Sequence, residues 1–68
     1  IGVGGRIFTK VWGKGLYELI NNEFQFIRGS ELYSTNRVES MVEINQKDIA
    51  ILSSSTEINI LKEDGDII

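Results

Sequence analysis

An isoleucine pair that returns after nine residues is the feature that most constrains the fold of this chain. Ile49 and Ile51 flank one alanine, Ile58 and Ile60 flank one asparagine nine residues later, and Ile67 follows after nine more. Side chains two residues apart point to the same face of a β-strand. Each pair therefore predicts a short strand with one apolar face, and the polar residues between the pairs predict turns.

The rest of the chain also has the pattern of short strands. Runs of β-branched and aromatic residues alternate with Gly, Asn, Asp or Ser, whereas helical periodicity is weak. The predicted strands cover residues 6–12, 16–20, 23–28, 37–44, 48–52, 57–61 and 66–68. Turns are predicted at 13–15, 21–22 and 63–66, because Gly and Asn adopt positive φ at low cost. The fold class predicted is all-β.

The composition divides this single small domain into two parts. Most aromatic residues lie in the first half, and the second half is rich in isoleucine. We predict a hairpin-rich β collar over residues 1–29 and β-helix repeats over residues 30–68. Within the strands, Phe24 and Phe26 are expected to share one apolar face, and Val42 and Ile44 another.

Two architectures fit the repeated isoleucines. One is a meander of short strands in a small monomeric β-barrel, similar to OB or SH3 folds. The other is a β-helix, in which each repeat buries its apolar face only against neighbouring repeats or other chains. The uniform isoleucine content favours the β-helix, because an irregular globular core is usually filled by side chains of several shapes.

Association with other copies is the expected source of stability. A 68-residue chain buries a small core, and this one has no Cys for a disulfide and no His for a zinc site. Three chains that wind together would place their apolar residues on a common axis. The predicted oligomer core consists of Val42, Ile44, Ile49, Ile51, Ile58, Ile60 and Ile67.

Several short motifs resemble those of a known family. They are GLY at 15–17 before NN at 21–22, RGS at 28–30, KDI at 47–49 and DGDI at 64–67. These motifs resemble the hairpin and turns in the C-terminal region of the central spike proteins of contractile phage tails and the related VgrG proteins of type VI secretion. The resemblance implies short hairpins that lead into an intertwined trimeric β-helix. It also implies a mechanical function, that of a rigid needle that pierces the target cell envelope.

The same resemblance implies the surroundings of the protein. A spike of this kind would be a homotrimer in the virion tail or baseplate, or in an extracellular injection apparatus. It would contact other baseplate or tail proteins and, transiently, the target membrane. No His is present to resemble the iron-binding tip that some spikes carry, and no metal or cofactor is expected.

Other functional classes have little support in the sequence. The net charge is −3 and the seven Lys and Arg residues are scattered, so nucleic-acid binding is not expected. The glycines at 2–5 and 13–15 lack the Ser or Thr and the helix that a phosphate-binding loop needs. The carboxylates between 57 and 66 lack the order of a calcium loop. Residues 53–56 carry hydroxyl groups, but the chain has no His that could activate one of them as a nucleophile. They are predicted as turn residues, and the protein is not expected to be an enzyme.

A binding module remains the alternative function. Phe8, Trp12 and Tyr17 together would form an exposed aromatic face on a small barrel, able to stack on a base, a sugar or a peptide side chain. Filling a core is the more common use of such residues.

Overall fold

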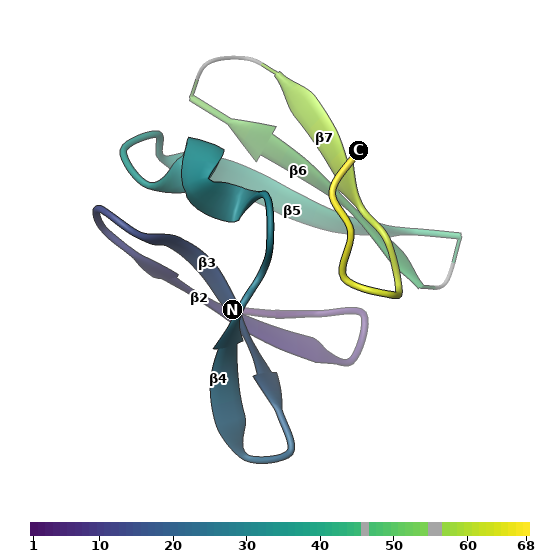
Figure 1. Ribbon diagram of the computed structural model, residues 1–68. Coiled ribbons are helices and arrows are strands. Elements are labelled where there is room, and N and C mark those ends of the chain that lie inside the picture. Colours follow the sequence, from purple (N-terminus) through teal and green to yellow (C-terminus); the bar gives the residue numbers. More distant parts are fainter. Residues whose placement is uncertain (46, 55–56) are drawn as a thin grey trace.

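The computed structural model describes residues 1–45, 47–54 and 57–68, and it is all-β (Figure 1). The strands form two antiparallel sheets. The first has the strand order β1 (Gly2–Val3), β2 (Arg6–Val11), β3 (Gly15–Ile20) and β4 (Glu23–Phe26), and the second has the order β5 (Val38–Ile44), β6 (Asp48–Ser53) and β7 (Ile58–Leu61). A short 3₁₀ helix, η1 (Ser30–Tyr33), lies between them in the sequence.

Most of the predicted strands are confirmed. The runs at 6–12, 16–20, 23–28, 37–44, 48–52 and 57–61 correspond to β2 through β7. The last run, 66–68, pairs with β7 through a bridge between Leu61 and Ile67 rather than forming a named strand. Ser53 ends β6 and is buried, which corrects its prediction as a turn residue. Ser55 and Thr56 lie outside the described residues.

The hairpin turns use the residues that tolerate positive φ. Asn21 and Asn22, with φ of 53° and 66°, connect β3 to β4, and two consecutive positive-φ residues match the right-handed twist of the flanking strands. Gly13, with φ of 81°, lies in the turn between β2 and β3. Both turns were predicted at these positions.

Helix η1 fits against the start of β3 because residue 15 has no side chain. A Cβ on Gly15 would lie 2.7 Å from the Ser30 carbonyl oxygen. Leu16 donates its backbone N–H to Ser30 Oγ at 3.0 Å, and that hydroxyl donates to the Leu16 carbonyl at 3.2 Å. Ser30 is fully buried, so both hydrogen bonds satisfy polar groups away from water.

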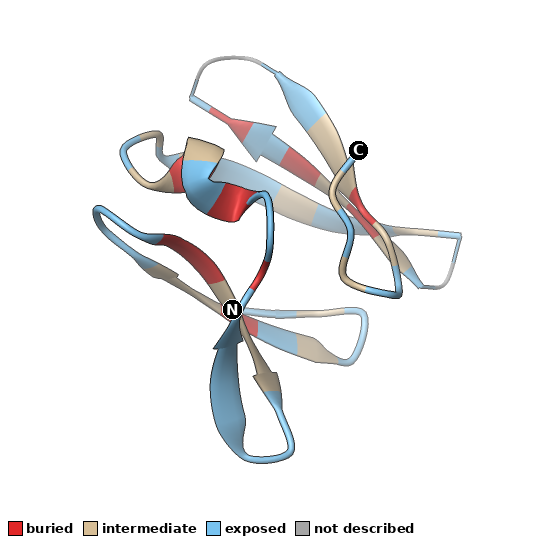
Figure 2. Cartoon of the chain, in the orientation of Figure 1, coloured by how far each residue is buried: buried red, intermediate tan, exposed pale blue. Residues whose placement is uncertain are grey.

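The core draws on both sheets and on η1 (Figure 2). Its buried side chains are Phe8, Leu16, Ile27, Tyr33, Ile49, Ile51 and Leu61. Tyr33 donates its hydroxyl to Asn59 Oδ1 at 3.2 Å, which gives the phenol a hydrogen-bond partner at the edge of the core. A single chain therefore has its own hydrophobic core.

The two Ile-x-Ile pairs lie on opposite faces of the second sheet. Cross-strand partners point to the same face, and here Ile51 pairs with Asn59 while Leu52 pairs with Ile58. Odd-numbered residues of β6 and β7 therefore point to the core and even-numbered residues point away from it. An interval of nine moves the second pair from odd to even positions, so Ile58 lies on the side opposite to Ile51.

Candidate functional site

The outward-facing side of the β5–β7 sheet is apolar over most of its length. We call it the outer β5–β7 face, and its apolar residues are Val42, Ile44, Ala50, Leu52, Ile58, Ile60 and Ile68. Ile58 is 67% exposed and Val42 is 54% exposed. Ile68 joins this face because it exchanges two backbone hydrogen bonds with Ile60, at 3.0 and 2.9 Å. A contiguous exposed surface made of several apolar side chains is typical of an interaction site.

The residues of the predicted oligomer core fall into two groups in the single chain. Ile49 and Ile51 are fully buried in the core, and Ile67 packs against it. Val42, Ile44, Ile58 and Ile60 lie together on the outer β5–β7 face. Burial of this second group by other copies of the chain stays a prediction.

A charged pair closes one end of the outer β5–β7 face. Lys62 Nζ donates to Asp48 Oδ2 at 2.9 Å, and the Glu63 N–H donates to Asp48 Oδ1 at 3.1 Å. The hydrogen bond from Lys62, followed by that from the Glu63 backbone, lowers the pKa of the Asp48 carboxyl despite its partial desolvation. The same pair raises the pKa of Lys62. The apolar face thus ends at a carboxylate and an ammonium group that satisfy each other.

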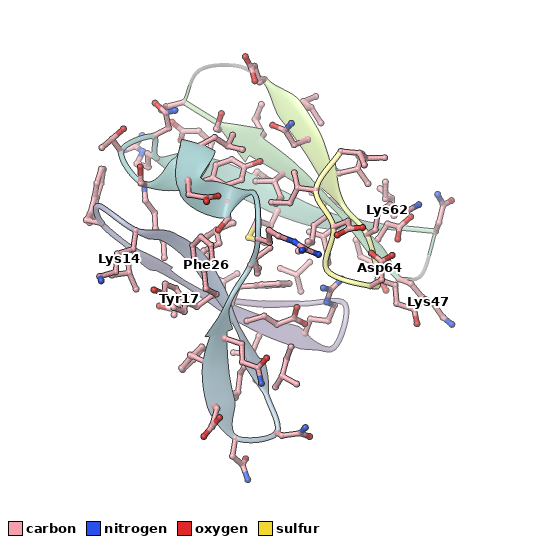
Figure 3. All side chains as sticks on the ribbon, viewed as in Figure 1. Lys14, Tyr17, Phe26, Lys47, Lys62 and Asp64 are labelled. Atoms are coloured by element: carbon pink, nitrogen blue, oxygen red, sulfur yellow. The ribbon has the colours of Figure 1, made fainter. Side chains whose placement is uncertain are left out.

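A second apolar surface covers the outward side of the first sheet. We call it the outer β2–β4 face, and it consists of Ile7, Val11, Tyr17, Leu19, Phe24 and Phe26. Tyr17 and Phe26 meet edge to face, with ring centroids 5.5 Å apart (Figure 3). Phe24 is 50% exposed. Phe24 and Phe26 share this face as the alternation predicted, and both side chains are exposed to solvent in the single chain.

The predicted aromatic face of Phe8, Trp12 and Tyr17 is not brought together. Phe8 pairs with Glu18 while Tyr17 pairs with Thr9, so the two rings lie on opposite sides of the sheet. Phe8 is 1% exposed and belongs to the core. Trp12 is 66% exposed in the β2–β3 turn, with Lys10 Nζ 3.7 Å from its ring centroid. Sequence reasoning missed that Phe24 and Phe26, rather than Phe8, accompany Tyr17.

A salt bridge between β2 and β3 also connects the two sheets. Arg6 binds Glu18 with two parallel hydrogen bonds of 2.8 Å, from Nε to Oε2 and from Nη2 to Oε1. Its Nη1 donates to the Lys47 carbonyl oxygen at 3.1 Å, in the loop that follows β5. The hydrogen bonds that Arg6 donates to Glu18 are the main cause that raises the pKa of Arg6. A bidentate pair of this kind fixes orientation as well as charge.

An open polar groove of about 570 Å³ lies beside this junction. Its lining residues are Asn45, Lys47, Asp48, Lys62, Glu63 and Asp64, and Figure 3 shows Lys47, Lys62 and Asp64 gathered near the C-terminal turn. Lys47 and Glu63 approach to 3.5 Å, so several of these charges compensate one another. In the described part of the chain, no group of three or more His, Cys, Asp or Glu side chains is placed to hold a metal ion.

Comparisons with known proteins add no assignment. No protein family, curated protein or solved structure matches the chain at a significant level. Within residues 1–45, 47–54 and 57–68, the structure contains no helix with the length and apolar character needed to cross a bilayer.

Proposed function

We propose that this chain is a structural module that associates with copies of itself, as a homotrimeric component of the central spike of a phage tail or a related contractile injection system. The outer β5–β7 face carries this proposal. It presents seven apolar side chains on one side of one sheet, and two of its members, Ile58 and Ile68, are at least two-thirds exposed. Burial of such a surface is the usual driving force of association.

The small core of the single chain supports association. Seven apolar residues form it, and a domain of this length has a marginal balance between burial and conformational entropy. Closing the outer β5–β7 face against other copies would add apolar burial without ordering more of the chain. Each copy would then gain stability from the assembly that it lacks alone.

The family resemblance supports the place of the module in a spike. The β3–β4 hairpin with its Asn21-Asn22 turn matches the hairpin part of the resemblance, and the turn at 64–67 matches a repeat turn. Three chains of charge −3 carry −9 together, which would discourage adhesion to an anionic envelope during passage. In this function the protein acts through rigidity and shape.

Two aspartate substitutions test the role of the outer β5–β7 face. Ile58→Asp should prevent assembly, because each interface would bury an unpaired carboxylate. Trp12→Asp is the matched control, since Trp12 and Ile58 are 66% and 67% exposed in the single chain and Trp12 lies on the other sheet. Light scattering should report a single chain for the Ile58 variant and the native mass for the Trp12 variant. Equal masses for Ile58→Asp and the native protein would refute the proposal.

A further inference from the structure

Strand β4 is an open edge of the first sheet. It pairs with β3 on one side only, and all four of its residues are exposed. Figure 2 shows the strand exposed along its whole length, and in Figure 1 the β3–β4 hairpin projects away from the second sheet. Edge strands present unpaired N–H and C=O groups that can pair with another strand.

The hydrogen-bond register identifies which peptide groups are open. Ile27 donates its N–H to the Leu16 carbonyl at 2.9 Å, and peptide groups along an antiparallel strand point alternately to the two sides. The backbone N–H and C=O groups of Gln25 and Ile27 therefore face β3, whereas those of Phe24 and Phe26 face the free edge. In the part of the chain that the structure describes, no other segment forms backbone hydrogen bonds with Phe24 or Phe26.

A groove of about 280 Å³ borders the same edge on its inner side. Ile20 and Ile27 contribute apolar surface to it, and the turn at 64–66 closes its far side. The charged groups that line it are the carboxylates of Glu18, Asp64 and Asp66 and the guanidinium of Arg28. Arg28 and Asp66 approach to only 3.7 Å, and the Arg28 side chain is 90% exposed. Arg6 already neutralises Glu18, and Arg28 lies near Asp66, so Asp64 gives the lining a net charge of one negative unit.

We propose that the β4 edge binds an extended segment of a partner polypeptide whose side chains alternate between apolar and basic. A strand added beside β4 would exchange backbone hydrogen bonds with Phe24 and Phe26. Its residues opposite these two would point to the outer β2–β4 face and contact the aromatic rings. Its intervening residues would point to the groove, where the net negative charge favours Lys or Arg.

This surface is separate from the one in the proposed function. The β4 edge belongs to the first sheet, and the outer β5–β7 face belongs to the second. Loss of peptide binding would leave the native mass unchanged, and loss of self-association would leave the β4 edge intact. The two proposals can therefore fail independently.

Two short peptides serve as probes. One is a fluorescein-labelled Lys-Val-Lys-Val-Lys amide, and the other is the same peptide with Glu in place of each Lys. Fluorescence anisotropy should show that the Lys peptide binds the native chain about tenfold more tightly than the Glu peptide, because each exposed ion pair changes affinity by a factor of a few. Its affinity should fall with added salt. Amide NMR shifts on binding should concentrate at Phe24 and Phe26.

Two variants at residue 24 separate backbone pairing from side-chain contact. Phe24→Pro removes an N–H that points to the free edge, so the first sheet keeps its own hydrogen bonds. Phe24→Val keeps that N–H and removes only the ring. The Lys peptide should bind Phe24→Val within a few-fold of the native chain and should not bind Phe24→Pro detectably. Circular dichroism should show that both variants keep their strand content.

Three results would overturn the proposal. They are equal binding of the Lys and Glu peptides, equal binding by the Pro and Val variants, and no binding of either peptide to the native chain. A fall in the native mass on Phe24→Pro would also overturn it, because that result would show that a second copy of this chain occupies the β4 edge.

Discussion

Replacing Ile51 by alanine should destabilise the single chain far more than the same change at Ile58. Ile51 is fully buried between the two sheets, and truncating a buried isoleucine costs about 2 to 5 kcal/mol from lost burial and the remaining cavity. We take about 3 kcal/mol as the expected loss in the free energy of unfolding. A domain of this length has a total stability of roughly 3 to 10 kcal/mol, so Ile51→Ala should remove between about a third and nearly all of it.

Ile58 gives the matched comparison, because it has the same side chain in the same sheet. In the single chain about two-thirds of its surface already contacts water, since Ile58 is 67% exposed. Its truncation should therefore cost the folded single chain about 1 kcal/mol or less. Any larger effect of Ile58→Ala should come from association and grow with protein concentration.

Urea unfolding followed by circular dichroism measures both effects. Each variant and the native protein are unfolded at several protein concentrations over about a hundredfold range. The loss at Ile51→Ala should persist at the lowest concentration, and the loss at Ile58→Ala should shrink there to about 1 kcal/mol or less. Equal losses for the two variants at the lowest concentration would refute the assignment of the isoleucine pairs to opposite faces.

Three further changes test local features of the fold. Glu18→Gln should lower the free energy of unfolding by about 2 kcal/mol in urea titrations, because it leaves the largely buried Arg6 charge without its charged partner. An unchanged stability would show that the salt bridge has no structural role. Gly15→Ala should lower the free energy of unfolding by about 2 to 3 kcal/mol, because residue 15 has a φ of 137° and its Cβ would press on the first carbonyl of η1. Gly13→Ala should lower it by about 1 kcal/mol, because the space around Gly13 is open. Equal melting temperatures for the two glycine variants would contradict the close approach of η1. Burial, and secondarily a nearby carboxylate, raises the pKa of Tyr33 from 10.0 to about 12. The unfolded chain therefore loses this proton first, and stability should be full below pH 10 and fall as the pH rises towards 12. Tyr33→Phe should show a smaller fall over the same range in urea titrations, and an identical pH dependence would contradict the burial of the phenol.

The strands were predictable from the sequence because alternation and turn residues act locally. Two asparagines with positive φ precede Phe24 and Phe26, which alternate with Gln25. This local pattern defines a hairpin without any distant contact. Helix η1 was not predicted. Its place depends on the fit of Ser30 against Gly15, which is a contact between residues far apart in the sequence.

The faces of the strands were harder to predict than the strands themselves. A strand pattern shows which side chains share a face, but the pairing register decides which face is covered. Phe8 and Tyr17 lie on opposite sides because β2 and β3 pair Phe8 with Glu18. Ile58 likewise lies opposite to Ile51 because β6 and β7 pair residues of equal parity.

The two apolar outer faces give the fold an unusual distribution of hydrophobic residues. In most antiparallel sheets one face packs on the core and the other is polar. Here Val42 and Ile58 lie on the outward side of one sheet, and Phe24 and Phe26 lie on the outward side of the other. Both sheets therefore expose apolar surface in addition to the core that they share.

The mass of the native chain in solution tests self-association most directly. Sedimentation equilibrium over a range of protein concentrations gives this mass without assuming a shape. Three chains of 7.7 kDa give about 23 kDa, and we predict this value at the higher concentrations. A mass of 7.7 kDa at every concentration would contradict it, because the outer β5–β7 face would then remain open to water in the absence of any other protein.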